Sequence, residues 1–217
     1  MKKVYFISGL GADKRAFNFL DLRFCEPVFI TWLQPLPNET LQSYALRIFE
    51  ACIKDEHATI IGLSLGGMLA TEIAKAHPST NVIIIASCKT FREIPAYLRF
   101  WRHLPVYKLT SRHSIHISGR IVLRILGARG KEQQQLQRQI LKDSNPAFTR
   151  WALDAVVKWR NETVPSNLVH IHGTADKLLP YSYVKADHTI IDGEHVMVMD
   201  RANELSALLE QLVTKNA

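Results

Sequence analysis

The chain has 217 residues, of which 47% are apolar and 22% charged, and its formal net charge is +7. The length fits one domain with a large insertion, and the composition excludes disordered, collagen-like and small disulfide-rich proteins. Taken alone, the positive charge suggests nucleic acid, anionic lipid or acidic substrates as partners.

Cysteine spacing and hydropathy indicate the compartment. Cys25, Cys52 and Cys88 form neither the even-numbered framework of a secreted domain nor the CxxC spacing of a zinc or redox site. The apolar run near the N-terminus meets charged residues without a signal-peptide cleavage site. No stretch approaches the roughly 18 to 20 apolar residues that cross a bilayer. We expect a cytoplasmic protein without a membrane span.

Short Val- and Ile-rich runs alternate with longer amphipathic segments, which is typical of βα units. Most runs lack polar alternation, so they predict buried parallel strands. The predicted strands are residues 3–8, 27–32, 58–62, 81–87, 167–172 and 188–192. Helices are predicted over 41–54, 65–77 and 201–213, the last with Asp200 as its N-cap.

Residues 89–163 show no strand pattern, only helical patterns interrupted by Pro and Gly. The clearest helix begins at Asn145-Pro146 and places Phe148, Trp151, Ala152, Ala155, Val156 and Trp159 on one face. We predict an α/β core of residues 1–88 and 164–217 with a helical cap, 89–163, that could fold over the carboxyl end of the sheet. For most of Phe100, Trp101, Trp151 and Trp159 we favour packing over lining a substrate site.

The hexapeptide Gly62-Leu63-Ser64-Leu65-Gly66-Gly67 closes a predicted strand and opens a predicted helix. A Ser at this sharp turn is held in a strained backbone conformation with its hydroxyl exposed, and glycines on either side avoid clashes. A chance GxSxG is the alternative, but it seldom falls between a strand and a helix. The pattern predicts Ser64 as a nucleophile.

A serine hydroxyl needs a base and an orienting acid, because it is almost fully protonated at neutral pH. Asp176 lies in the loop after the strand at 167–172, and His195 lies after the last strand, just before the final helix. Ser, then Asp, then His at successive strand ends is the order of a nucleophile-elbow hydrolase.

The chain resembles the α/β-hydrolase fold family over essentially its whole length. The likeness rests on the GLSLGG turn, the HGTADKLLP segment and the DGEH segment before a Leu-rich helix. It implies that Ser64 is the nucleophile, that His195 is general base and then acid, and that Asp176 orients and stabilises the imidazole. Residues 89–163 then correspond to the family's variable cap.

Each assignment has competitors. The rivals of Asp176 are expected to be solvated loop and helix residues: Asp154, Asp187, Asp192 and Glu194. His172 and His188 compete with His195 but belong to strand edges. His170 and His172 alternate on one strand and invite a metal site, yet no carboxylate or thiol pattern supports it. We expect neither metal nor cofactor.

An oxyanion hole needs two backbone N–H groups. One is expected from Leu65, at a helix N-terminus, and the other by position from Leu10 in the loop after the first strand. The family usually carries His-Gly before this donor, whereas Ser8 replaces the His here, which weakens any subfamily assignment. A phosphate-binding loop is a poor alternative because no Lys-Ser/Thr follows.

The first predicted strand begins at residue 3, where the family commonly has a preceding antiparallel hairpin. We therefore expect about six strands, mainly parallel and doubly wound, without the family's first two. One sheet edge is left exposed. A homodimer could cover it, but no sequence feature supports one.

The function predicted best is a serine hydrolase that cleaves a carboxylic ester or thioester of a small molecule through an acyl-enzyme. The alternative from another class is a small-molecule receptor or noncatalytic partner on the same fold. Carbon–carbon hydrolysis, lyase chemistry, perhydrolysis and acyl transfer stay open. Haloalkane dehalogenation is disfavoured, because Ser64 stands where that reaction needs a carboxylate.

The positive charge is unevenly distributed. Residues 89–163 hold 15 Lys or Arg and 5 Asp or Glu, while the rest of the chain holds 12 and 15. This argues against nucleic-acid binding by the core. The cations are either solvated helix faces, which we favour, or a guide for anionic substrates.

Overall fold

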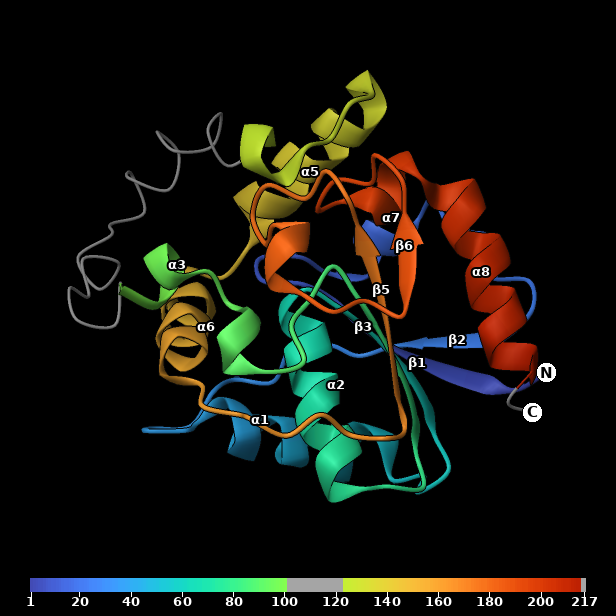
Figure 1. The fold of residues 1–217 in the computed structure, drawn as a ribbon. Coiled ribbons are helices and arrows are strands. Elements are labelled where there is room, and N and C mark those ends of the chain that lie inside the picture. The colour runs from blue at the N-terminus through green and yellow to red at the C-terminus, as the bar shows by residue number, and fades with distance from the viewer. Residues whose placement is uncertain (101–122, 216–217) are drawn as a thin grey trace.

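A computed structural model describes residues 1–100 and 123–215. Its centre is a six-stranded, all-parallel sheet in the order β2-β1-β3-β4-β5-β6, with helices on both faces (Figure 1). The strands are β1 (Lys3–Ile7), β2 (Glu26–Phe29), β3 (Thr59–Leu63), β4 (Asn81–Ile85), β5 (Leu168–Gly173) and β6 (His188–Ile190). The predicted doubly wound sheet is confirmed.

The strand order reverses between β1 and β3. The chain passes from β1 to β2 on one side and returns to place β3 on the other side of β1. In open parallel sheets, such a reversal leaves a crevice at the carboxyl ends of the two strands, and ligands bind there. Ile7 pairs with Gly62 at that end of the sheet.

Alternate side chains of each strand enter two separate cores. Tyr5 and Ile7 of β1 pack on the side of α1 (Leu41–Ile48) and α2 (Leu65–Ala76). Val4 and Phe6 pack on the opposite side, with α7 (Met197–Asp200) and α8 (Ala202–Lys215). Figure 1 shows α8 and α2 on opposite sides of the sheet. Burial on both faces explains why the strands are Val- and Ile-rich.

The helices follow the predicted ones with two differences. The segment predicted at 41–54 continues from α1 into a π-helical turn, Phe49–Ile53, which ends at Lys54 with φ 57°. The N-cap predicted at Asp200 was wrong: Asp200 ends α7, and its Oδ1 accepts a hydrogen bond from the Arg129 N–H. No helix in the described ranges is long and apolar enough to cross a membrane.

Within residues 89–163, the described parts contain helices and no strand: α3 (Ala96–Phe100), α5 (Lys131–Asp143) and α6 (Pro146–Lys158). Trp151 packs against Tyr44 of α1, with ring centroids 4.3 Å apart. Trp159 is buried, and its Nε1–H donates to Glu72 Oε1 of α2. These two tryptophans therefore pack this segment against α1 and α2. Trp101 lies outside the described residues.

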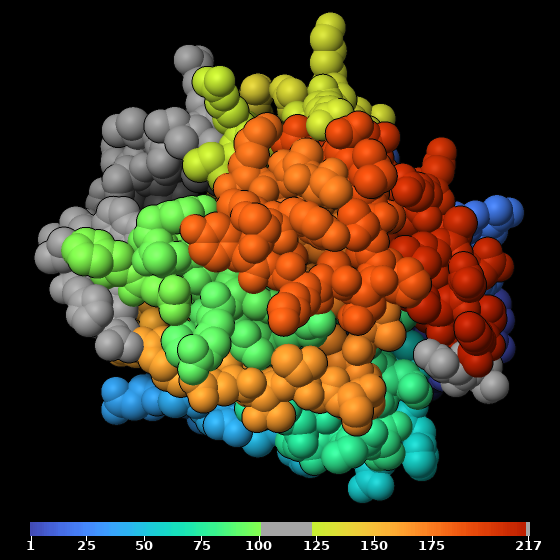
Figure 2. Space-filling model, viewed as in Figure 1, coloured from blue at the N-terminus to red at the C-terminus, as the bar shows by residue number. Residues whose placement is uncertain are grey.

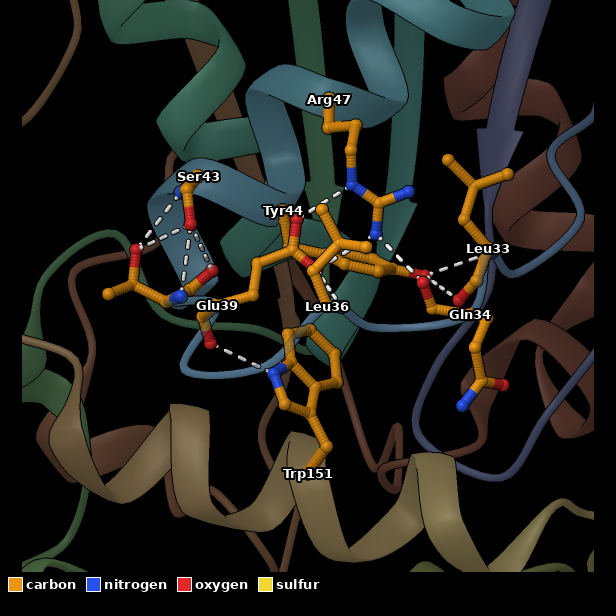
Figure 3. Close-up of polar contacts among 9 residues, drawn as sticks. Leu33, Gln34, Leu36, Glu39, Ser43, Tyr44, Arg47 and Trp151 are labelled. Atoms are coloured by element: carbon orange, nitrogen blue, oxygen red, sulfur yellow. Dashed lines mark hydrogen bonds and ion pairs between the residues drawn. The ribbon is translucent and has the colours of Figure 1, made fainter.

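A polar network ties α6 to α1 (Figure 3). The Glu39 carboxylate accepts from Arg47 Nε at 2.7 Å and from Arg47 Nη2 at 2.8 Å, and the Glu39 carbonyl accepts from Trp151 Nε1 at 2.9 Å. The Arg47 guanidinium also lies over the Tyr44 ring. The hydrogen bond from Arg47 lowers the pKa of the Glu39 carboxyl, whose side chain is 5% exposed.

Arg47→Ala should lower the free energy of unfolding by about 2 kcal/mol, because it leaves the buried Glu39 carboxylate without its cation. Urea denaturation measures the change. Arg23→Ala is the matched control: Arg23 pairs with Asp21 in the same two-point geometry but in full solvent, so its removal should leave the midpoint unchanged. Equal midpoints for the two variants would contradict the structural role of the Glu39 pair.

Candidate active site

Ser64 occupies the sharp turn between β3 and α2. Its backbone has φ 52° and ψ −116°, a conformation that side-chain-bearing residues rarely adopt. The Ser64 N–H donates to Ile85 O at 2.9 Å, and its carbonyl accepts from Ser87 Oγ at 2.7 Å. Hydrogen bonds from β4 and the loop that follows it thus hold the strained turn in place.

Close packing at the turn requires the glycines of the hexapeptide. A Cβ on Gly62 would clash with the Gly66 backbone, and a Cβ on Gly66 would clash with the carbonyl oxygens of Ile7 and Ser8. The N-terminus of α2 therefore lies directly against the end of β1. Ser64 lies at the β1–β3 reversal, where a parallel sheet has its crevice.

The structure brings Ser64, His195 and Asp176 into one hydrogen-bonded chain. His195 Nε2 lies 2.9 Å from Ser64 Oγ, and His195 Nδ1 lies 2.8 Å from Asp176 Oδ2. Both His195 and Asp176 are 4% exposed. With its proton on Nδ1 facing the carboxylate, the imidazole presents Nε2 as an acceptor for the serine hydroxyl.

Asp176 is held as an acceptor on both oxygens. Its Oδ1 accepts from the N–H groups of Leu178 at 2.9 Å and Leu179 at 2.8 Å, while Oδ2 faces His195. Burial alone raises the pKa of this carboxyl, but His195, the Leu179 N–H and His172 together bring the pKa below its usual value. The carboxylate is therefore ionised at neutral pH.

Of the competing residues, His172 lies 3.4 Å from Asp176 and Glu194 directly precedes His195 in the sequence, while the others lie farther away. None of them hydrogen-bonds to Ser64 or His195: Asp187 accepts from the His170 N–H, Asp154 pairs with Lys158, Asp192 lies near Arg201, and His188 begins β6. His170 and His172 are fully buried. Within the described residues, no group of three His, Cys, Asp or Glu side chains could hold a metal.

The two expected oxyanion donors lie on either side of the turn. Leu65 is the first residue of α2, and Leu10 lies in the loop after β1, where a Cβ on Gly9 would be 3.3 Å from Ser64 Cβ. Neither of these two N–H groups donates a hydrogen bond to any described residue. Ser8, at the family's usual His position, donates from Oγ to Ala12 O at 3.0 Å and so closes the loop that carries Leu10.

Sequence reasoning missed a cluster of ion pairs around Glu194. Glu194 was expected in solvent, but it is 7% exposed and accepts from Arg129 Nη2 at 3.1 Å and Lys177 Nζ at 3.1 Å. A Cβ on Gly127 would clash with the Glu194 side chain, so the two backbones lie close together. Arg129 thereby connects residues 89–163 to the loops that carry His195 and Asp176. The adjacency of Glu194 to His195 was the only sequence signal.

The sequence matches the alpha/beta hydrolase family over residues 4–208. No protein of curated function matched it. The fold is similar to a thermophilic esterase from Thermogutta terrifontis in its malate-bound structure, with TM-score 0.82 and 14% identity over all of this chain and 90% of the other.

Two other solved structures are similar. A meta-cleavage product hydrolase from Pseudomonas fluorescens has TM-score 0.70 and 16% identity, over all of this chain and 92% of the other. An enol-lactonase from Burkholderia xenovorans has TM-score 0.74 and 13% identity, over 98% and 91%. At these identities the likeness shows the fold, and the family match covers nearly the whole sequence. The chain therefore belongs to the alpha/beta hydrolase family.

Proposed function

We propose that this protein is a serine hydrolase that cleaves a carboxylic ester or thioester of a small molecule through an acyl-enzyme. The observation that carries the proposal is the chain of hydrogen bonds from Ser64 through His195 to Asp176, at a strained turn. The names of two similar structures, an esterase and an enol-lactonase, agree with this reaction class.

In the proposed mechanism, Ser64 Oγ attacks the carbonyl carbon while His195 Nε2 takes its proton. Negative charge develops on the carbonyl oxygen, for which the N–H groups of Leu10 and Leu65 are the proposed donors. His195 then returns the proton to the leaving alcohol or thiol, which leaves an acyl group on Ser64. Water, deprotonated by His195, then attacks the acyl carbon, the bond from that carbon to Ser64 Oγ breaks, and Ser64 Oγ takes the proton back from His195 as the acid leaves. Asp176 stays ionised and stabilises the imidazolium throughout.

The first competitor is a small-molecule receptor, since the same fold also serves for binding. A receptor needs no activated serine, so reactivity of Ser64 separates the two classes. Carbon–carbon hydrolysis, lyase chemistry, perhydrolysis and acyl transfer run from the same three residues, and one similar structure is a meta-cleavage product hydrolase. Product analysis separates these reactions from ester cleavage.

A fluorophosphonate probe should label the wild-type protein at one site, and Ser64→Ala should abolish labelling, because the Ser64 hydroxyl faces the base His195. Intact-protein mass spectrometry measures the adduct. Ser79→Ala is the control: Ser79 is exposed and its Oγ bonds to Glu56 O, so labelling should persist. Equal labelling of wild type and Ser64→Ala would refute the nucleophile.

Asp176→Asn should lower kcat for ester hydrolysis by about 10³- to 10⁴-fold, because an amide cannot stabilise the imidazolium and favours the wrong tautomer. Initial rates on short-chain aryl esters measure the loss. The thermal unfolding midpoint reports whether the fold is intact. Asp192→Asn is the matched control, since Asp192 lies in the loop before His195 but is exposed, and it should keep wild-type activity.

Electrostatic guidance of anionic substrates is the second expectation to test. A cavity of about 330 Å³ beside Glu194 is lined by four cations, Arg124, Arg129, Arg138 and Lys177. If these charges attract substrate, kcat/KM for anionic esters should fall as salt rises, whereas kcat/KM for neutral esters of equal acyl length should not. A hydrolysis screen over acyl length and charge measures both. Salt-insensitive kcat/KM for the anionic esters would contradict electrostatic guidance by these cations.

A further inference from the structure

Two histidines of β5 lie buried behind Asp176 and take no part in the proposed mechanism. His170 and His172 are both 0% exposed. His170 Nε2 lies 3.1 Å from His172 Nδ1, and His172 Nε2 lies 2.8 Å from the carbonyl oxygen of Leu179. His172 Nε2 is also 3.4 Å from Asp176 Oδ2. The polar groups of the site thus extend from Ser64 to the buried side chains of β5, next to the edge strand β6.

The proton positions follow from the acceptors. A carbonyl oxygen only accepts, so the 2.8 Å contact with Leu179 places a proton on His172 Nε2. In a neutral ring, His172 Nδ1 is then an acceptor, and the proton between the rings belongs to His170 Nε2. This leaves His170 Nδ1 unprotonated, and that nitrogen has no hydrogen-bond partner among the described residues.

Burial keeps both rings neutral. Desolvation, with smaller effects from neighbouring charges, lowers the pKa of His170 to about 2, and desolvation also lowers the pKa of His172. The titratable or charged groups facing the two rings and Asp176 come from several loops: Cys88, Lys89, Tyr97, Tyr181, Asp187 and His195. Of these six, His195 belongs to the proposed catalytic chain.

We propose that His172 is a positioning residue for the catalytic chain, with its proton fixed on Nε2 by His170. Its Nε2–H holds the Leu179 carbonyl, and the Leu179 N–H in turn holds Asp176 Oδ1, so His172 fixes the turn that carries the carboxylate. The same N–H lies beside Oδ2, the oxygen that faces His195. The proposal rests on the hydrolase function proposed above and adds a residue to it.

The His172 N–H changes how the negative charge of Asp176 acts on His195. The N–H dipole of His172 withdraws part of the negative charge of Oδ2 that would otherwise act on His195. Without it, the protonated imidazole faces a more concentrated charge and is stabilised. The acid limb of the reactivity profile should then move to higher pH.

The test uses the rate of fluorophosphonate labelling against pH, which needs no knowledge of the substrate. His172→Leu should move the acid limb of this profile upward by on the order of half a pH unit or more. His172→Gln, whose amide can donate from the position of Nε2, should restore the limb toward wild type. His188→Leu is the control. His188 lies half-buried on β6, outside the hydrogen-bonded chain of the site, so the acid limb of the profile should stay in place.

If the His172→Leu protein is folded and still labelled at Ser64, but its acid limb has not moved, the role of His172 is refuted while the proposed hydrolase function stands. If labelling of the wild-type protein does not depend on Ser64, the proposed hydrolase function is refuted instead. Nitrogen–proton NMR correlations of the wild-type rings test the proposal even if His172→Leu fails to fold. We expect His170 and His172 as neutral Nε2–H tautomers from about pH 5 to 9. An Nδ1–H tautomer of His172, or its titration in this range, would overturn the proposal.

Discussion

The close approach of α2 to the end of β1 is the constraint on which the site depends. Gly62 and Gly66 leave no room for a Cβ, and Ser64 between them takes a strained backbone conformation with positive φ that β4 and its following loop hold by hydrogen bonds. This packing fixes Ser64 Oγ at the point where the strand order reverses. The loop carrying Leu10 reaches the same point, because it follows β1 directly. A strained turn of this kind persists only where the surrounding fold over-determines it.

The other two residues of the hydrogen-bonded chain depend on separate supports. Asp176 is fixed within its own turn by the N–H groups of Leu178 and Leu179. His195 lies in the loop between β6 and α7, and its neighbour Glu194 is bound both by Lys177 from the Asp176 loop and by Arg129 from residues 89–163. Residues 89–163 therefore support the site from outside, although none of their described members belongs to the hydrogen-bonded chain of Ser64, His195 and Asp176. The packing of residues 89–163 on α1 through Glu39 and Trp151 connects that support to the body of the fold.

The sequence predicted the sheet, because buried parallel strands are continuous apolar runs that local composition reveals. It also predicted which Ser, Asp and His meet, because each follows a strand and the strand ends converge. It did not predict the burial of Glu194, which depends on the contact of Gly127 with a loop distant in sequence. The separate helix α7 was missed for a related reason: Asp200 looked like a cap but bonds to Arg129 across the fold. Local pattern carries no information on such long-range partners.

The histidines of β5 also run against the local pattern. Parallel strands at the centre of a sheet favour Val and Ile, and a buried polar ring costs stability unless its nitrogens are hydrogen-bonded. His172 meets this condition on both nitrogens, but His170 leaves Nδ1 unpartnered within the described structure. The His170 side chain therefore contributes little to the stability of the fold, and its role is to donate a hydrogen bond to His172 Nδ1. Two buried histidines cost stability, and their hydrogen bonds lead to Asp176. Such a conflict with the local sequence pattern is expected at functional sites, where the geometry of the reacting groups takes precedence over stability.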